Sequence, residues 1–429
     1  MNARQLAACA ERLQEFLTTT LATVGRAERR RHGSLYVQGL LLDGERKSIE
    51  PLAGRVAGAE VQALQQFVGH SPWAWEPVRR RLAQRMAAQL EPAAAWIIDD
   101  TGFPKQGRHS VGVARQYSGT LGKVGNCQVA VSVHLSTTTK SMPLDGALYL
   151  PQAWTEDTQR CQQAGVPGPI RFRTKIELAL ELIDQLLEWG LRRQPVLADA
   201  GYGNSTKFRA GLAGRGLHYL VGVESNTAVW AKPTQRVQPR RRAGRGRPRG
   251  PYYRGQPIAL PELAAALPPQ AWHTLTWRQG TQGPQRSRFT ACRVQPAHGH
   301  AHRQPQLEPV WMLIQWPAES AAPTKYWFSN LPAGVSWRRL VRLAKLRWRV
   351  EQNYQQLKEE LGLDHYEGRG WQGWHHHVTL VCLAYAFLLL ERQRLKKNPG
   401  ADFARGAAMS ATGADSHVRR LPDLPAQAH

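Results

Sequence analysis

Apolar residues recur every three or four positions along residues 336–361, a period that predicts one long amphipathic helix with Ser336 as its N-cap. The apolar stripe consists of Leu340, Leu343, Leu346, Val350, Tyr354, Leu357 and Leu361. Beside this stripe, Arg347, Glu351 and Lys358 are spaced four and then seven residues apart, so all three project from nearly the same side. Taken alone, an acid between two bases on a helix is more often a solvated ion-pair ladder than a functional site.

Residues 1–92 show helical periodicity, which predicts an all-helical N-terminal domain. One helix is expected to end at Gly69, and the next is expected to begin with Ser71 as its N-cap and Pro72 in its first turn. The region is basic, and a helix, a tight turn and a basic helix are compatible with DNA binding of the helix-turn-helix kind. The same pattern is common in ordinary helix bundles, so this signal is weak.

At Ala93 the pattern changes to short apolar runs and alternating segments, which predict strands. Residues 96–98 form the first expected strand, which ends in Asp99 and Asp100 and leads into a loop containing Gly102 and Pro104. Further strands are expected at 111–117, 127–135, 144–150, 196–198 and 219–223, with helices at 175–191 and 205–213. Three antiparallel strands followed by alternating helices and strands predict an α/β domain with a mixed sheet.

The charge of the chain indicates a polyanionic partner. Among 429 residues, 57 are Lys or Arg and 32 are Asp or Glu, which gives a net charge of +25. Nucleic acid is the first candidate. A membrane surface is the second, but the longest apolar run, residues 378–390, is shorter than the roughly 20 residues that span a bilayer and is expected to form a buried helix. The N-terminal stretch lacks the character of a signal peptide, so a cytoplasmic location is expected.

Neither cysteine nor histidine shows an organised metal-binding pattern. The five cysteines contain no CxxC pair, which indicates neither a zinc module nor a disulfide framework. The histidines at 298–302 are expected in a solvated loop, whereas those at 375–377 precede the apolar run and could face phosphate as easily as metal.

Residues 225–332 carry the strongest local charge. Between Glu224 and Glu308 the sequence has thirteen arginines and one lysine, and Glu262 is the only acid. Stretches rich in Trp and β-branched residues predict a β-rich basic insertion that includes an Arg-, Gly- and Pro-rich loop. In this loop, Arg245 and Arg247 belong to an Arg-Gly-Arg-Pro string similar to the core of an AT-hook, which fits a narrow minor groove; phosphate contact is the more general expectation. Residues 398–429 are expected to form a flexible tail.

Three carboxylates fall at the ends of predicted elements. Asp99 and Asp199 each end a strand, and Glu351 lies on the long helix. Carboxylates in such places can converge on a pair of Mg²⁺ ions, which act in phosphodiester chemistry. For each acid alone a structural role is open: Asp99 or Asp100 could cap a turn, Asp199 could cap the following loop, and Glu351 could pair with Arg347.

The segments IIDDTGFPK, VLADAGYG and RWRVEQNYQQLKEELGL together resemble the DDE transposases of bacterial insertion sequences, in particular the group with a Tyr-(2)-Arg-(3)-Glu-(6)-Lys signature. Arg347, Glu351 and Lys358 match the last three letters, while Ala344 stands at the tyrosine position. The resemblance covers residues from about 93 to 390. It implies an RNase H-like mixed-sheet catalytic core in two parts, residues 93–224 and 333–397, interrupted by the β-rich insertion.

The resemblance also implies roles for individual residues. Asp99, Asp199 and Glu351 would be the catalytic acids and would bind two Mg²⁺ ions, for which Mn²⁺ can substitute; Asp100 is the rival of Asp99. Phosphates of the transposon end would be held by Arg347 and Lys358, and a displaced base could stack on Trp371 or Trp374, for which a role in the core is equally open.

The implied function is that of a DNA transposase, which binds terminal inverted repeats, cleaves DNA with metal ions and joins the freed 3′-hydroxyl to target DNA. Its partners would be double-stranded DNA, at the transposon ends and at the target, and a second copy of the chain in a homodimeric DNA complex. Its expected location is the bacterial cytoplasm, in association with the nucleoid. One alternative is a domesticated or inactive relative that binds DNA in a regulatory role, and a weaker one is a nuclease that never joins ends.

Overall fold

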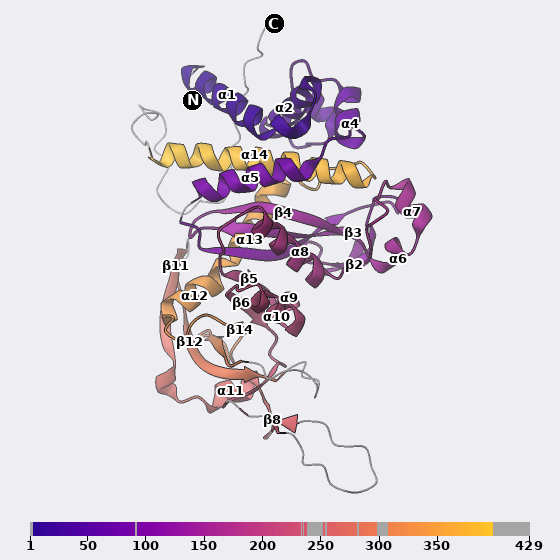
Figure 1. The fold of residues 1–429 in the computed structure, drawn as a ribbon. Coiled ribbons are helices and arrows are strands. Elements are labelled where there is room, and N and C mark those ends of the chain that lie inside the picture. The colour runs from indigo at the N-terminus through magenta and orange to yellow at the C-terminus, as the bar shows by residue number, and fades with distance from the viewer. Residues whose placement is uncertain are drawn as a thin grey trace. The chain divides into compact units, whose positions relative to one another are not determined.

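The computed structural model describes residues 3–90, 92–232, 234, 236–237, 252–253, 255–280, 283–297 and 308–397 (Figure 1). These residues form two compact units. The first comprises Met1–Ala93, Asp99–Arg192 and Arg349–His429, and the second comprises Ala94–Ile98 and Arg193–Trp348. The division into a helical domain, a two-part core, an insertion and a tail stays a prediction. Arg245, Arg247, the histidines at 298–302 and the tail from residue 398 lie outside the described residues.

The first unit contains a group of antiparallel strands. Strand β3 (Lys123–Ser136) pairs with β2 (Ala114–Ser118) and with β4 (Ser141–Tyr149), and both pairs are antiparallel, as the alternating pattern predicted. Strand β1 (Ala95–Pro104) also neighbours β3, and its residues from Asp99 onward belong to this unit. Helix α8 (Lys175–Glu188) packs on β3 and β4, and its capping box at Thr174 marks its start.

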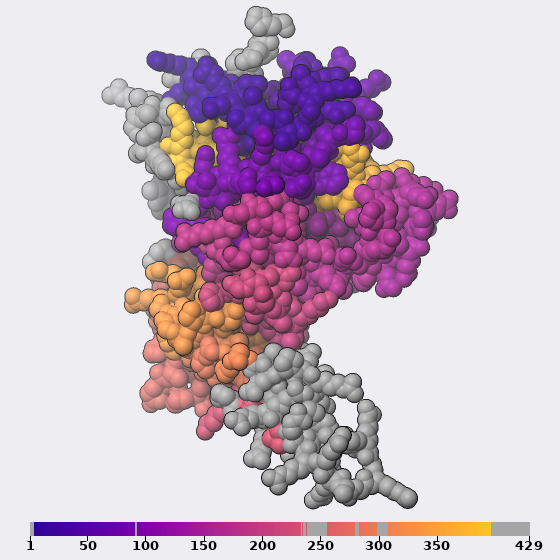
Figure 2. All heavy atoms as spheres, viewed as in Figure 1, coloured from indigo at the N-terminus to yellow at the C-terminus, as the bar shows by residue number. Residues whose placement is uncertain are grey.

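The first unit also contains one long apolar helix, α14 (Trp371–Lys397), and several shorter helices. The helices are α1 (Ala3–Thr20), η1 (Ala22–Val24), α2 (Ala27–Leu41), α3 (Ile49–Ala53), α4 (Val61–Gly69), α5 (Trp75–Gln89), α6 (Gln152–Thr155), α7 (Thr158–Gln163) and α13 (Trp348–Glu359). Helices α2, α4 and α5 pack directly on α14, so this helix shows only as two yellow patches in Figure 2. By length and composition α14 could cross a membrane, but 89% of its apolar window is buried inside the protein, as expected for a core helix.

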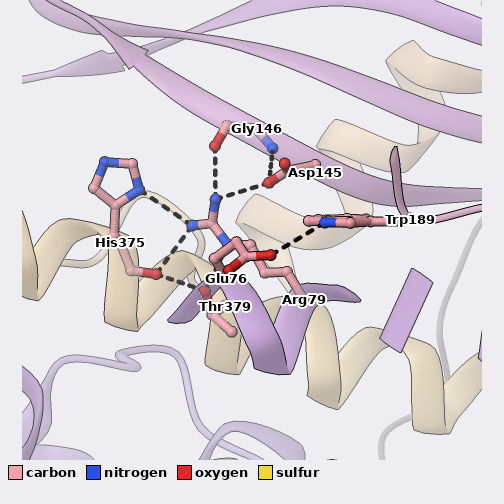
Figure 3. Close-up of polar contacts among 7 residues, drawn as sticks. All are labelled: Glu76, Arg79, Asp145, Gly146, Trp189, His375 and Thr379. Carbon is pink, nitrogen blue, oxygen red and sulfur yellow. Dashed lines mark hydrogen bonds and ion pairs between the residues drawn. The ribbon is translucent and has the colours of Figure 1, made fainter. Parts of the chain in front are cut away.

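A buried arginine joins three segments of the first unit (Figure 3). The guanidinium of Arg79 on α5 donates to the Asp145 carboxylate (2.9 Å) and the Gly146 carbonyl (2.7 Å) on β4. It also donates to the Thr379 hydroxyl (2.7 Å) and the His375 carbonyl (3.1 Å) on α14. Burial raises the pKa of Asp145, while the charge of Arg79 opposes that rise. The pair therefore ties the helical region to the sheet by a desolvated charge interaction.

The structure corrects the predicted helix start at Ser71 and Pro72. Helix α5 begins at Trp75, and residues 71–74 are irregular. This segment places Trp73 in the core, where its ring stacks on Phe67 (5.5 Å) and on His376 (3.7 Å). Burial of a tryptophan between two rings outweighs the preference of a Ser-Pro pair for a helix start.

The predicted exposure of the histidines at 375–377 to phosphate or metal is wrong. All three side chains are buried in α14 and bond to protein groups. Both ring nitrogens of His376 lie at carbonyls, those of Val68 (2.9 Å) and Trp73 (2.8 Å), and His377 bonds to Tyr36 (2.9 Å). These side chains satisfy buried polar groups of the core.

The second unit contains a mixed sheet. Strand β5 (Val196–Ala198) runs parallel to the start of β1 and to β6 (Tyr219–Val223), at the bounds that the sequence predicted for β5 and β6. Antiparallel strands continue from β6 through β14 (Lys325–Ser329), β13 (Val310–Trp316) and β12 (Gly283–Pro296). The predicted mixed α/β sheet is therefore confirmed.

The other elements of the second unit are short. The strands are β7 (Ala228–Trp230), β8 (Arg236–Val237), β9 (Tyr252–Tyr253), β10 (Ile258–Ala259) and β11 (His273–Gly280). The helices are α9 (Ala200–Gly203), α10 (Thr206–Gly214), α11 (Leu260–Ala266), η2 (Pro269–Ala271) and α12 (Trp337–Leu346). Strand β11 pairs with β12, and β8 pairs with β9 in a separate two-stranded sheet. The described part of residues 225–332 is thus rich in strands, as predicted.

The structure also corrects the predicted single helix over residues 336–361. Ser336 caps α12 as expected, but the helix is interrupted by a turn at Arg347, and α13 follows from Trp348. Arg347, the C-cap residue of α12, has helical dihedral angles (φ −54°, ψ −34°). The two halves pack on different strands, α12 on β6 and β11 of the second unit and α13 on strands of the first.

A further correction concerns β1. The predicted strand of residues 96–98 continues through both aspartates to Pro104, where a loop was expected. Strand β3 gives this second half a neighbour, so Gly102 and Pro104 are part of the sheet. Gly102 is required there because a Cβ atom would overlap the Ser118 hydroxyl of β2.

Candidate functional site

Asp99 and Asp100 are neighbours on β1 with different surroundings. Successive strand residues face opposite sides, so only one of the two carboxylates can face a given side of the sheet. The carboxylate of Asp100 bonds to the ammonium of Lys175, at 2.5 Å. Asp99 is 8% exposed, and its Oδ1 accepts a hydrogen bond from the Asp100 backbone N–H (3.0 Å). The ion pair of Asp100 favours Asp99 as the functional acid.

Asp199 directly follows β5 and is the N-cap of the short helix α9. Its Oδ1 accepts from the backbone N–H of Tyr202, at 3.4 Å. Helix α9 lies close to β6 because Gly203 has no side chain: a Cβ there would overlap the carbonyl of Gly222. The capping role that the sequence left open is therefore present, and it uses only one of the roughly four acceptor positions of a carboxylate.

Glu351 lies in the exposed first turn of α13, and two residues of the next turn bind α13 to the sheet of the first unit. Asn353 Oδ1 lies 2.6 Å from Nδ1 of His134 on β3. The Tyr354 hydroxyl lies 2.5 Å from Ser132 Oγ and 3.5 Å from the backbone carbonyl of Asp99. Helix α13 is thereby held to β3, and the Tyr354 hydroxyl lies near the backbone of Asp99.

The direction of each hydrogen bond in this network can be assigned. Burial lowers the pKa of His134 to about 4, and the bond to Asn353 opposes that shift, so the ring is neutral at pH 7. A neutral ring has one donor nitrogen and one acceptor nitrogen. Nδ1–H then donates to Asn353, Nε2 accepts from Ser132 (2.7 Å), and Ser132 accepts from Tyr354. The network therefore fixes α13, which carries Glu351, on β3 within the first unit.

The structure reveals a sequence signal for this network that was missed. Tyr354 was counted with the apolar stripe of its helix, although its hydroxyl makes the bond to Ser132. Ser132 and His134 stand two residues apart, on one face of a strand whose neighbouring residues are buried. Polar residues at two successive same-face positions of a buried strand need partners, and that need was the available signal.

Lys358 lies in the last turn of α13, and its ammonium bonds within the first unit. It donates to the carbonyl of Gly102 (2.7 Å) and to the hydroxyl of Thr120 (2.9 Å), and it lies over the ring of Phe103. Burial lowers the pKa of Lys358, and the nearby Asp364 opposes that shift. The predicted phosphate clamp therefore also connects α13 to β1 and to the β2–β3 turn.

The other predicted DNA contacts differ in exposure. Arg347 is partly buried at the end of α12, in the second unit. Trp371 opens α14 and is 8% exposed, with its ring 4.5 Å from that of His375. Trp374 is buried, and its ring packs edge-on against Phe103. Both tryptophans thus occupy the core, the alternative that the sequence left open.

The donor chemistry of the three predicted acids suits Mg²⁺, which takes carboxylate oxygens. Asp99 and Glu351 lie in the first unit and Asp199 in the second. Within the part of the chain that the structure describes, no group of three or more His, Cys, Asp or Glu side chains is arranged to hold a metal ion. The residue types therefore fit the ion, while a completed ligand set stays a prediction.

Comparisons with known proteins add independent information. The family model described as DDE superfamily endonuclease matches residues 19–284, more than half of the chain. This range includes Asp99 and Asp199 and ends before Glu351.

A curated relative, the probable transposase for insertion sequence element IS701 of Microchaete diplosiphon, is 35% identical over 202 residues, which are 47% of this chain and 50% of the relative. The chain thus matches about half the length of this relative. A cryo-EM structure of a piggyBac transposase synaptic complex with hairpin DNA aligns with 80% of this chain and 63% of that chain, with a TM-score of 0.34 and 12% identity.

Proposed function

Because the chain belongs to the DDE superfamily of endonucleases, we propose that it is a transposase that cleaves DNA with metal ions, using Asp99, Asp199 and Glu351 as its catalytic carboxylates. The proposal extends to the binding of terminal inverted repeats, to the joining of the freed 3′-hydroxyl to target DNA, and to a homodimer in the DNA complex. It also includes an RNase H-like organisation of the core and a site of action at the bacterial nucleoid.

The register of two parallel strands carries this proposal. In the second unit Trp96 pairs with Val196 and Ile97 pairs with Leu197. Asp99 and Asp199 each follow these pairs by two residues, so the two acids stand at equivalent positions after two strand segments that pair in parallel. Glu351 lies three residues before Tyr354, one helical turn from the hydroxyl that approaches Asp99.

Asp99, Asp199 and Glu351 would hold two Mg²⁺ ions, or Mn²⁺ in their place. When bound, such a pair activates the attacking oxygen and stabilises the leaving oxygen of a phosphodiester. The protein's own residues contribute orientation. The network of His134, Ser132 and Tyr354 fixes α13 against β3.

The basic residues would bind the DNA. Arg347 and Lys358 would contact phosphates near the cut, and the net charge of +25 would provide general attraction to the duplex. Arg245 and Arg247 would extend the contact into the minor groove. For Lys358, its bonds to Gly102 and Thr120 would fix the position from which the ammonium meets a phosphate.

The test uses the full chain and a duplex that copies the DNA directly flanking its reading frame, where the ends of a mobile element would lie. We expect Mg²⁺-dependent cleavage by the wild type, and its loss in Asp199→Asn and in Glu351→Gln, with retention of the duplex in a gel shift. Asp100→Asn is the matched control and is expected to cleave, because Asp100 is paired with Lys175.

Near-wild-type cleavage by Asp199→Asn and by Glu351→Gln would overturn the catalytic assignment. Binding without cleavage by the wild type would instead support a regulatory DNA-binding relative. Cleavage without joining to a target duplex would indicate a nuclease.

A further inference from the structure

The end of the β2–β3 hairpin carries two of the most exposed large apolar side chains of the described residues. Tyr117 is 63% exposed and Val124 is 53% exposed. They are opposite each other in the antiparallel register, and Arg115, two residues before Tyr117, shares their face of the hairpin. Two adjacent exposed apolar side chains form a patch, which requires an explanation that a single exposed residue does not.

This patch lies on a rigid support. The turn between the strands closes with a hydrogen bond from the Leu121 N–H to the Ser118 carbonyl (3.1 Å). The Thr120 hydroxyl donates to the Gly102 carbonyl of β1 (3.3 Å) and accepts from the Lys358 ammonium of α13 (2.9 Å). The hairpin end is thus fixed to the strand that carries Asp99 and to the helix that carries Glu351.

The charge around the patch identifies the kind of partner. From Thr101 to Leu144 the sequence contains no Asp or Glu, whereas it has the cations Lys105, Arg108, Arg115, Lys123 and Lys140. Arg115 and Lys123 are exposed beside the two apolar side chains. Apolar and aromatic side chains beside cations, in a segment whose own sequence has no acid, fit a polyanion better than the mixed charges of a protein surface.

We propose that the end of the β2–β3 hairpin is a DNA contact beside the cleavage site. Tyr117 and Val124 pack against a sugar or base step of the bound DNA, and Arg115 and Lys123 contact the flanking phosphates. This inference rests on the proposed nuclease function and adds to it a surface that orients the duplex on Asp99 and Glu351.

The experiment places a photoreactive benzoylphenylalanine at position 117 and irradiates the full chain with the duplex that copies the flanking DNA. We expect a cross-link from position 117 to the duplex. In parallel, Tyr117→Ala is expected to weaken binding roughly 10-fold, the effect of losing one aromatic stacking contact, whereas Tyr117→Phe retains affinity. Lys123→Gln is expected to reduce the salt dependence of binding by about one phosphate contact.

Ile170→Ala is the matched control, because Ile170 is an exposed apolar residue of the same unit that lies outside the hairpin. It is expected to bind and cleave as the wild type does. A cross-link from position 117 to a second copy of the chain, or unchanged affinity in Tyr117→Ala while the wild type cleaves, would overturn this inference alone. A wild type that neither binds nor cleaves the duplex would overturn the proposed function as well.

Discussion

The replacement Arg79→Met tests the buried network that joins α5, β4 and α14 (Figure 3). Methionine approximates the length of the arginine stem but removes the charge and every donor. Asp145 would then keep only the bond from the Gly146 backbone N–H, at 2.8 Å, in a site where its side chain is 10% exposed. The Gly146 carbonyl would lose the Arg79 donor as well.

The expected cost follows from this burial. The side chain of Arg79 is 6% exposed, and removal of one partner of a buried ion pair costs about 3–5 kcal/mol because the other charge is left desolvated. We therefore expect the free energy of unfolding to fall by about 4 kcal/mol. The matched control is Arg173→Met, since Arg173 and Glu181 form an exposed pair (47% and 54%), and its expected cost is about 0–1 kcal/mol.

The cost should also depend on pH. Burial raises the pKa of Asp145 in the folded protein, and Arg79 opposes the rise, so Arg79→Met raises it further. A raised acid pKa means that the folded state binds the proton more tightly, so stability is lost as pH rises above the unfolded value of 3.8. The difference in the free energy of unfolding between Arg79→Met and the wild type is therefore expected to become smaller at acid pH.

The assay is unfolding of the full chain in urea, monitored by tryptophan fluorescence, for the wild type, Arg79→Met, Asp145→Asn and the double variant. Because Asp145→Asn removes the stranded charge, the double variant is expected to be less destabilised than the sum of the two single variants. A loss below about 1 kcal/mol in Arg79→Met, or strict additivity of the two changes, would refute the desolvated ion pair as the cause.

Three further predictions concern other parts of the protein. Tyr354→Phe removes the hydroxyl that approaches Asp99, so we expect the free energy of unfolding in urea to fall by about 1 kcal/mol. Mg²⁺-dependent cleavage should also fall, while DNA binding in a gel shift stays unchanged. Gly102→Ala forces a Cβ into the Ser118 hydroxyl and is expected to cost about 1–3 kcal/mol by urea unfolding, with partial recovery in combination with Ser118→Gly. Burial, together with the charge of Lys325, lowers the pKa of Lys345 to about 7, so the stability of the wild type should rise between about pH 7 and the unfolded pKa of 10.5. Thermal unfolding across this pH range should show the rise in the wild type and not in Lys345→Met.

The sequence predicted those features that depend on local pattern. Strands β5 and β6 appear at the expected residues because a short apolar run between turn residues usually forms a buried strand. The N-cap at Ser336 was also found, because capping depends on the residue and its near neighbours alone.

Features that depend on distant partners could not be predicted in the same way. Strand β1 continues through Gly102 because β3 pairs beyond Asp99, and no local pattern shows that pairing. The interruption at Arg347 follows from the different strands on which the two halves of the helix pack. Trp73 displaces a Ser-Pro helix start because its ring stacks on a histidine from a segment about 300 residues away.

The candidate site also has a part that local sequence pattern predicts and a part that depends on distant partners. The acids Asp99, Asp199 and Glu351 could be proposed from their places at element ends and from a family resemblance. The network of His134, Ser132 and Tyr354 could not, because its bonds join β3 to α13 across more than 200 residues of chain. Such side-chain bonds become visible only once the tertiary structure is known.

The central claim is that Asp99, Asp199 and Glu351 hold the same pair of metal ions, and iron-directed cleavage of the protein tests it most directly. Fe²⁺ replaces Mg²⁺ in the full chain with the flanking duplex, and ascorbate and peroxide then generate radicals that cut the polypeptide beside the bound ion. If the three acids share the ions, the polypeptide is cut near all three. Excess Mg²⁺ then suppresses all of these cuts together, and Asp199→Asn abolishes them together. Cuts near only one of the three acids, or at other places in the chain, would contradict the claim.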